Sequence, residues 1–226
     1  MKKLALAIAC VALLSAAAWA NATPPQVTLS DSDFGNVYFG NTAGTLSFWF
    51  SGTAAQCGAA RAGCVTGAGL LDPNGDLGTY WLWISGSHPT LSFAGGSDYT
   101  VNPGAYTINL EVDLNNGNKL TATVLLTDLV GTKLVSPQFS GSFTTVSATS
   151  EFYADGFSPT GLPGEIDFTL NMGNHHKVFG LGSGQTTNGY LSSGEAVPSV
   201  PEPSSLALLG TGVLGLAGII RRKMKG

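Results

Sequence analysis

Charged side chains are scarce in this chain of 226 residues, where Asp, Glu, Lys and Arg together make up 11%. Only four basic residues lie between positions 23 and 200, against 13 acidic residues, which gives this part of the chain a net charge of −9. Because an acidic surface repels phosphate backbones, we expect no nucleic-acid partner.

Sequence signatures of common catalytic machinery are also missing. No Ser-His-Asp or Cys-His pattern is recognisable, and no glycine-rich loop fits the phosphate-binding pattern GxxxxGK[ST]. The sequence therefore predicts a protein that is not an enzyme and that needs no cofactor.

Cysteine is limited to three residues. Cys10 lies in an N-terminal apolar run, whereas Cys57 and Cys64 lie in one loop rich in Gly and Ala. An even pair in an oxidising compartment predicts a disulfide between Cys57 and Cys64. Metal binding by the pair is the weaker alternative, because no His or third Cys lies nearby in the sequence.

The middle of the chain favours strands joined by turns over helices. It is rich in Gly, Thr, Ser, Asn and aromatic residues and poor in Lys, Glu and Arg. The clearest signal is a hairpin, in which two alternating runs at 106–114 and 120–127 flank Asn116-Gly117. For this turn we expect a positive φ at both Asn116 and Gly117.

Period-two patterns predict further strands in the middle of the chain, and no helix is expected there. The ranges are 45–50, 79–85, 89–93, 142–148 and 165–170. Many short strands with turn signals between them predict an all-β fold, an antiparallel β-sandwich that is jelly-roll-like.

The N-terminus has the layout of a secretory signal peptide. Lys2 and Lys3 precede an apolar run, and small residues follow at Ala18-Trp19-Ala20 and Ala20-Asn21-Ala22. We expect residues 1–22 to be removed on export, with an uncleaved membrane anchor as the alternative.

The C-terminus combines three features in a fixed order. Pro201, Glu202 and Pro203 come first, an uncharged apolar run follows at 206–220, and a basic membrane-stop cluster comes last, formed by Arg221, Arg222 and Lys223. The two prolines hold their segment extended and outside the following helix. The apolar run is short for a bilayer, since a helix of its length spans roughly 22 Å.

This tail resembles the PEP-CTERM sorting signal of Gram-negative bacteria. The resemblance covers positions 200–226 and implies transient insertion in the inner membrane by a short transmembrane helix, followed by cleavage by exosortase near Pro201-Glu202-Pro203. It also implies a host species that makes exopolysaccharide and grows as a biofilm. A permanent stop-transfer anchor is the alternative.

Together these features predict four parts. Residues 1–22 are the signal peptide, 23–179 the β-sandwich domain, 180–199 a flexible Gly/Ser/Thr linker, and 200–226 the sorting signal. We expect a non-catalytic surface or extracellular-matrix protein whose partners are the secretory machinery, exosortase and extracellular polysaccharide. A carbohydrate-binding module is the alternative, and a glycan-cleaving enzyme is a third hypothesis.

Each of the two alternatives has candidate residues. Trp81 and Trp83 share one face of a predicted strand and are a candidate sugar platform, unless both strand faces are buried. Glu165-Ile166-Asp167 resembles a catalytic strand of laminarinase-like β-glucanases, which are also jelly-roll sandwiches. The third carboxylate that this resemblance implies is replaced by Thr169 or Leu170, which favours an ordinary solvent-facing strand.

Two more segments carry groups that bind metals in other proteins. Asp72-Pro73-Asn74-Gly75-Asp76 begins like a calcium loop, but Leu77 and Trp83 at the positions of the EF-hand glycine and glutamate exclude an EF-hand. A plain turn is favoured over a simpler calcium loop. His175 and His176 are adjacent and predicted to point apart on the surface, so that no metal site is expected.

Overall fold

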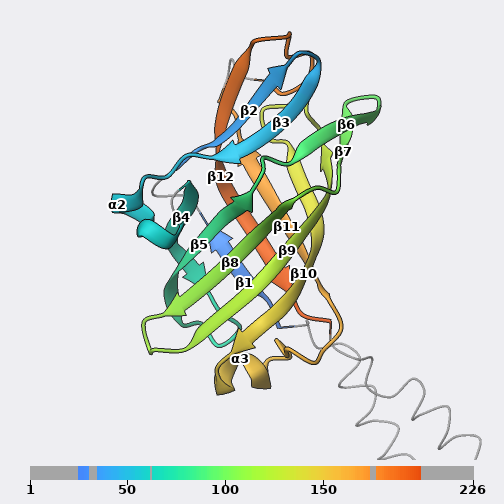
Figure 1. Cartoon of the computed structure of the whole chain (residues 1–226). Coiled ribbons are helices and arrows are strands. Elements are labelled where there is room, and N and C mark those ends of the chain that lie inside the picture. The colour runs from blue at the N-terminus through green and yellow to red at the C-terminus, as the bar shows by residue number, and fades with distance from the viewer. Residues whose placement is uncertain (1–24, 31–34, 62, 174–176, 200–226) are drawn as a thin grey trace, which may run out of the picture. The chain divides into compact units, whose positions relative to one another are not determined.

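The computed structural model describes residues 25–30, 35–61, 63–173 and 177–199, which belong to one unit of the chain, residues 25–199 (Figure 1). The predicted signal peptide, the Pro-Glu-Pro segment, the basic cluster and the pair His175-His176 lie outside the described residues. No helix within the described ranges has the length and apolarity needed to cross a membrane.

Strands dominate this unit, as the composition predicts. The strands are β1 (Val27–Ser30), β2 (Val37–Thr42), β3 (Thr45–Phe50), β4 (Cys64–Leu71), β5 (Leu77–Gly86), β6 (Thr90–Gly95), β7 (Asp98–Val101), β8 (Tyr106–Leu114), β9 (Lys119–Val130), β10 (Gln138–Ala148), β11 (Gly164–Asn171) and β12 (Thr186–Val197). The described helical structure consists of α2 (Ala54–Cys57), a 3-10 turn η1 (Ala59–Arg61) and α3 (Ser150–Ala154). Each of these segments is too short to show the 3.6-residue periodicity of a helix, so the sequence pattern did not predict them.

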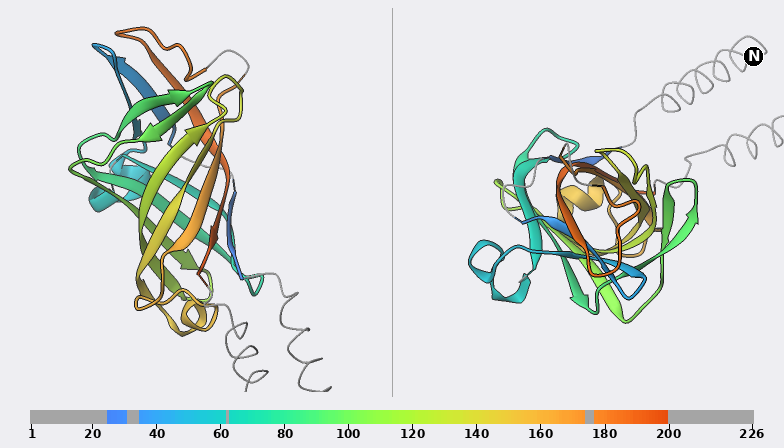
Figure 2. Two further views of the ribbon diagram at one scale, coloured as in Figure 1. Left: turned by 90° about the vertical axis from the view of Figure 1, so that its right-hand side faces the viewer. Right: turned by 90° about the horizontal axis from the view of Figure 1, so that it is seen from above.

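Hydrogen bonding closes the sheet on itself. Strands β1, β4, β5, β8, β9, β10, β11 and β12 pair in this order, and β12 pairs again with β1. A second closed ring of paired strands also contains β9 to β12. It continues from β12 through β2, β3, β6 and β7, and β7 pairs with β9. Figure 2 shows the unit from above as a ring of strands. All of these pairs are antiparallel, and the long strands from β8 to β12 follow each other in both sequence and space.

The core lies inside the ring, between facing strands as in a sandwich. Apolar residues alternate inward along each strand, as in β8, where Ile108, Leu110, Val112 and Leu114 are buried. The largest fully buried side chains include Phe39, Phe48, Tyr80, Phe152, Phe157 and Phe168. The predicted all-β antiparallel fold is therefore confirmed, and the pairing adds closure, which removes free edges.

Helix α3 closes one end of the ring. Its Phe152 is fully buried and meets Phe157 edge-on at 5.7 Å between ring centroids. Phe157 in turn stacks on Phe143 of β10, also at 5.7 Å. The β4–β5 and β8–β9 turns lie at this same end, beside α3 (Figure 1).

The predicted linker at 180–199 is wrong over most of its length. Residues 186–197 form β12, which pairs with β11, β1 and β2 and is therefore interior to the sheet. Apart from Leu191, its inward positions are occupied by small residues, because neighbouring side chains fill the space: a Cβ at Gly194 would come within 2.7 Å of the Phe168 ring. The neighbouring strands leave no room for large side chains at these positions, so the segment contains few large apolar residues.

The β8–β9 hairpin is present, but its turn differs from the predicted one. Only Gly117 has a positive φ, at 90°, and Asn116 does not. The amide N–H of Leu114 donates to the carbonyl of Asn118, and that of Gly117 donates to the carbonyl of Leu114. This is a three-residue connection in which one glycine supplies the left-handed residue.

Candidate functional site

Trp81 and Trp83 lie on the outer face of the ring. Along β5 they alternate with Tyr80 and Leu82, which are buried in the core, while the two tryptophans are half-buried. Directly across the strand pairs, Trp81 faces Glu111 of β8 and Trp83 faces Cys64 of β4. The strand face that the sequence predicts as a candidate sugar platform therefore lies on the outside of the ring and is partly shielded from solvent.

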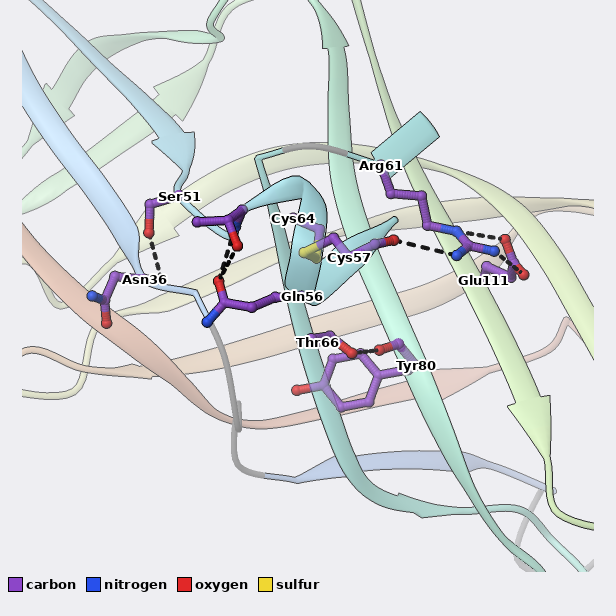
Figure 3. The surroundings of a disulfide bond; sticks show 10 residues. Asn36, Ser51, Gln56, Cys57, Arg61, Cys64, Thr66, Tyr80 and Glu111 are labelled. Carbon is purple, nitrogen blue, oxygen red and sulfur yellow. Dashed lines mark hydrogen bonds and ion pairs between the residues drawn. A yellow bond between two sulfur atoms is a disulfide. The ribbon is translucent and has the colours of Figure 1, made fainter. Parts of the chain in front are cut away.

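A disulfide-bonded loop covers part of this outer face. The structure joins Cys57 at the end of α2 to Cys64 at the start of β4, with Cα atoms 6.0 Å apart (Figure 3). A capping box begins α2, where the amide N–H of Thr53 donates to Oε1 of Gln56 at 2.9 Å. The loop has no large apolar core of its own, and the disulfide attaches it to the ring.

Arg61 connects this loop to the tryptophans. Its Nη2 and Nε donate to the two carboxylate oxygens of Glu111 at 2.5 and 3.0 Å (Figure 3). The guanidinium carbon lies 4.6 Å from the ring centroid of Trp81 and 5.8 Å from that of Trp83. Such a bidentate pair fixes the guanidinium plane. The tryptophan faces are thus in contact with a cation, which narrows the surface on which a sugar ring can stack.

A second aromatic cluster on the outer face was not found from the sequence. Trp49 of β3 stacks on Tyr38 of β2 at 5.6 Å and on His88 at 5.2 Å between ring centroids. The alternation of Trp49 with the buried Phe48 and Phe50 already places it outward. Its stacking partners come from other segments and carry no local sequence signal.

Glu165 and Asp167 are exposed on the outer face of β11, where they border an open hollow of about 420 Å³. Thr127, Ser140, Gly141 and Ser142 line the rest of it. Of the two positions that could carry the third carboxylate in the glucanase resemblance, Leu170 points inward and is 1% exposed, and Thr169 is half-buried on the outer side but has no carboxylate.

One further carboxylate lies on the strand next to Asp167. Glu195 of β12 is directly opposite Asp167 across the β11–β12 pair, and it is also exposed. Neighbouring positions of this kind have Cβ atoms roughly 5 Å apart. All three carboxylates therefore lie exposed on an open strand surface.

A cluster of acidic residues lies where α3 meets the turns of the ring. Asp72 and Asp76 of the β4–β5 turn and Glu151 of α3 each offer one oxygen, and these three oxygens lie within 4.8 Å of one another. Asparagine side chains surround them. Asn74 donates to Glu151 at 3.1 Å and to Asp155 at 3.2 Å, and Asn116 donates to Asp76 at 2.8 Å.

The carboxyl groups of Glu151 and Asp155, at this cluster, have raised pKa values. Desolvation raises the pKa of Glu151, and the negative charge of Asp72 and a hydrogen bond with Asp76 raise it further, against the lowering effect of Asn74 and Asn116. Desolvation and the charge of Asp72 also raise the pKa of Asp155. The sequence pointed to Asp72 and Asp76 as part of a turn, but Glu151 lies far along the chain and could not be connected with them.

Comparison with known proteins identifies the C-terminal tail. Residues 199–223 match the family model of the PEP-CTERM protein-sorting motif. No curated protein and no solved structure matches the chain. The resemblance found in the tail is confirmed, and the motif implies export and processing by exosortase, with a surface or extracellular location.

Proposed function

We propose that this protein is a non-catalytic component of the cell surface or extracellular matrix, associated with exopolysaccharide and delivered by its sorting tail. The observation that carries the proposal is the PEP-CTERM motif at 199–223, because such a tail is a routing device for exosortase substrates. The motif itself assigns no activity to the ring.

The geometry of the ring supports a structural role. Large apolar side chains fill its interior, and its paired strands leave few free edges, which limits aggregation outside the cell. The disulfide is suited to an oxidising compartment. In the described part of the chain the carboxylates near the outer hollow are exposed, which supports a surface role over glycan cleavage.

The order of export and folding follows from β12. This strand ends at Val197, and the matched motif begins at residue 199, so the processing segment directly follows a strand that pairs on both sides. The ring therefore cannot close until residues 186–197 have crossed the inner membrane. We infer that exosortase acts on a chain whose folded ring lies only a few residues from the Pro-Glu-Pro segment.

The first test is the intact mass of the protein recovered from the medium, outer membrane and inner membrane of an exosortase-containing host. We expect a species outside the inner membrane that begins at Asn21 or Thr23 and ends near Pro201-Glu202-Pro203. A triple alanine variant of the Pro-Glu-Pro segment serves as the control and should keep its tail in the inner membrane. Wild-type protein that retains residues 206–226 there would refute processing and delivery.

A carbohydrate-binding module is the second candidate, because Trp81 and Trp83 both lie on the outer face. Co-sedimentation with the exopolysaccharide of the host tests it. Loss of sedimentation in the Trp81→Ala, Trp83→Ala double variant, with Trp49→Ala unaffected, would support direct sugar binding by these two tryptophans. Sedimentation of both variants at the wild-type level would exclude them as a sugar site, and thermal melts of each variant check its folding.

A further inference from the structure

Two segments that are distant in sequence bring their acidic side chains to one place at the end of the ring closed by α3. Asp72 and Asp76 come from the β4–β5 turn and Glu151 from α3, and one oxygen from each lies within 4.8 Å of the others. The β8–β9 turn also contacts this cluster, because Asn116 donates to Asp76 at 2.8 Å and to Glu151 at 3.0 Å.

Asp72 is the most buried group of this cluster and is only 3% exposed. Its Oδ1 accepts hydrogen bonds from the amide N–H groups of Asn74 at 3.0 Å and Asp76 at 2.6 Å. Its Oδ2 is buried and has no hydrogen-bond partner among the residues that the structure describes. A buried carboxylate oxygen without a partner is costly, and proteins satisfy such an atom with a donor or a cation.

No basic side chain neutralises the cluster within the described residues. The ion pairs there join Arg61 to Glu111 and Lys119 to Asp113, away from Asp72. Asp155, which shares the Asn74 amide with Glu151, adds a fourth carboxyl group. Carboxylates this close together repel one another, and a cation between them would remove that repulsion.

We propose that Asp72, Asp76 and Glu151 form a calcium site, with the unpartnered Oδ2 of Asp72 as a ligand. The donors are all oxygens, and no His or Cys belongs to the group, which disfavours zinc and copper. Calcium accepts six to eight oxygens in irregular geometry, whereas magnesium requires a compact octahedron. Three carboxylates from a turn and a separate helix suit the larger ion.

Asn74 supplies a further ligand in this arrangement. Its amide nitrogen now donates to Glu151 and Asp155, and rotation of the amide would present its carbonyl oxygen to the ion instead. The bound cation would replace the asparagine N–H groups as the partner of these carboxylates. Calcium at the concentrations found outside cells fills sites whose dissociation constants are about 10⁻⁴ to 10⁻³ M.

The site would hold the end of the ring closed. Glu151 precedes Phe152, whose fully buried ring closes that end, and Asp72 and Asp76 belong to the adjoining turn. A cation between them would tie α3 to the β4–β5 turn. Calcium is therefore expected to stabilise the folded ring and to protect α3 from local opening.

Titration of the full chain in mild detergent with Ca²⁺ alone, followed by calorimetry and by the melting temperature, tests the proposal. We expect one ion per chain, a dissociation constant below about 1 mM and a rise in Tm of several degrees at saturation. Hydrogen exchange at residues 150–154 should slow on adding Ca²⁺. Absence of binding at 10 mM Ca²⁺, or equally tight binding of Mg²⁺, would overturn it.

Substitutions of the proposed ligands test where the ion binds. Asp72→Asn keeps an acceptor for the two turn amides and should weaken Ca²⁺ binding at least about tenfold, since it removes the charge on the buried carboxylate. Glu151→Gln, on the half-exposed side of α3, should do the same and remains informative if Asp72→Asn folds poorly. Glu195→Gln makes the matched charge change on β12 and should bind Ca²⁺ normally. Unchanged affinity in both test variants would refute this location.

Discussion

Replacing Leu191 with alanine should destabilise the protein by about 3 kcal/mol. Leu191 is 1% exposed on β12 and pairs with Leu170 across the β11–β12 pair. Truncating a buried leucine costs about 2 to 5 kcal/mol, because transfer free energy is lost and a cavity remains. The dense packing of β12 against its neighbours limits collapse around this cavity. With a urea m-value of about 3 kcal/mol/M, the unfolding midpoint should fall by about 1 M.

Urea unfolding of the exported protein, followed by tryptophan fluorescence, measures this change. Leu125→Ala is the matched control, because Leu125 lies in β9 and is 56% exposed, and it should cost less than about 1 kcal/mol. A stop after residue 185 should also abolish cooperative unfolding, whereas a stop after residue 199 should preserve it. If Leu191→Ala unfolds within 0.2 M of the wild type, β12 is not part of the core.

Three further predictions concern the outer loop and one partly buried tyrosine. Replacing Cys57 and Cys64 by serine should lower stability by roughly 2 kcal/mol, since the disulfide closes a short loop; a change below about 0.5 kcal/mol in urea unfolding would contradict this. Arg61→Ala should expose the tryptophans beneath the guanidinium, seen as red-shifted emission and stronger acrylamide quenching, with Arg61→Lys intermediate; identical quenching would argue against the contact. Burial raises the pKa of Tyr106 above 10.0, and its hydroxyl donates to the carbonyl of Asn102 at 2.7 Å. The folded state therefore keeps this proton longer than the unfolded state, so stability should fall as pH rises from 10 through the raised pKa, and Tyr106→Phe should remove that fall in alkaline melts; a phenol that ionises at its ordinary pKa would refute it.

In most of the strands that the sequence predicts, large apolar side chains alternate with polar ones, and in β5 both faces carry large apolar or aromatic side chains. β3 and β11 match their predicted ranges closely, and β8 and β9 were expected together as a hairpin. β12 was missed because its inward positions include Gly189 and Gly194. The Met172 sulfur and the Phe168 ring fill the space in front of these glycines, so the apolar volume belongs to neighbouring segments.

The candidate sites also combine features that a local sequence pattern predicts with contacts that it does not predict. The outward position of Trp81 and Trp83 follows from alternation along one strand. The contact with Arg61 does not, because the guanidinium reaches the rings from a separate loop and is oriented by Glu111 on β8. Likewise, the turn at Asp72 is readable in the sequence, but the approach of Glu151 depends on where β10 places α3.

The sequence by itself determined the export tail, the all-β class, the central hairpin and the two cysteines that pair, since each depends on residue types within a short stretch. Only the tertiary structure decided that β12 closes the ring, that the tryptophans lie under a cation, and that the carboxylates of Asp72, Asp76 and Glu151 come together. Those outcomes depend on contacts between segments that are separate in the sequence, of which the pairing of Val27 with Ala196 spans the greatest distance. Such pairings are selected by the packing of the whole ring, to which each local pattern contributes only a small part.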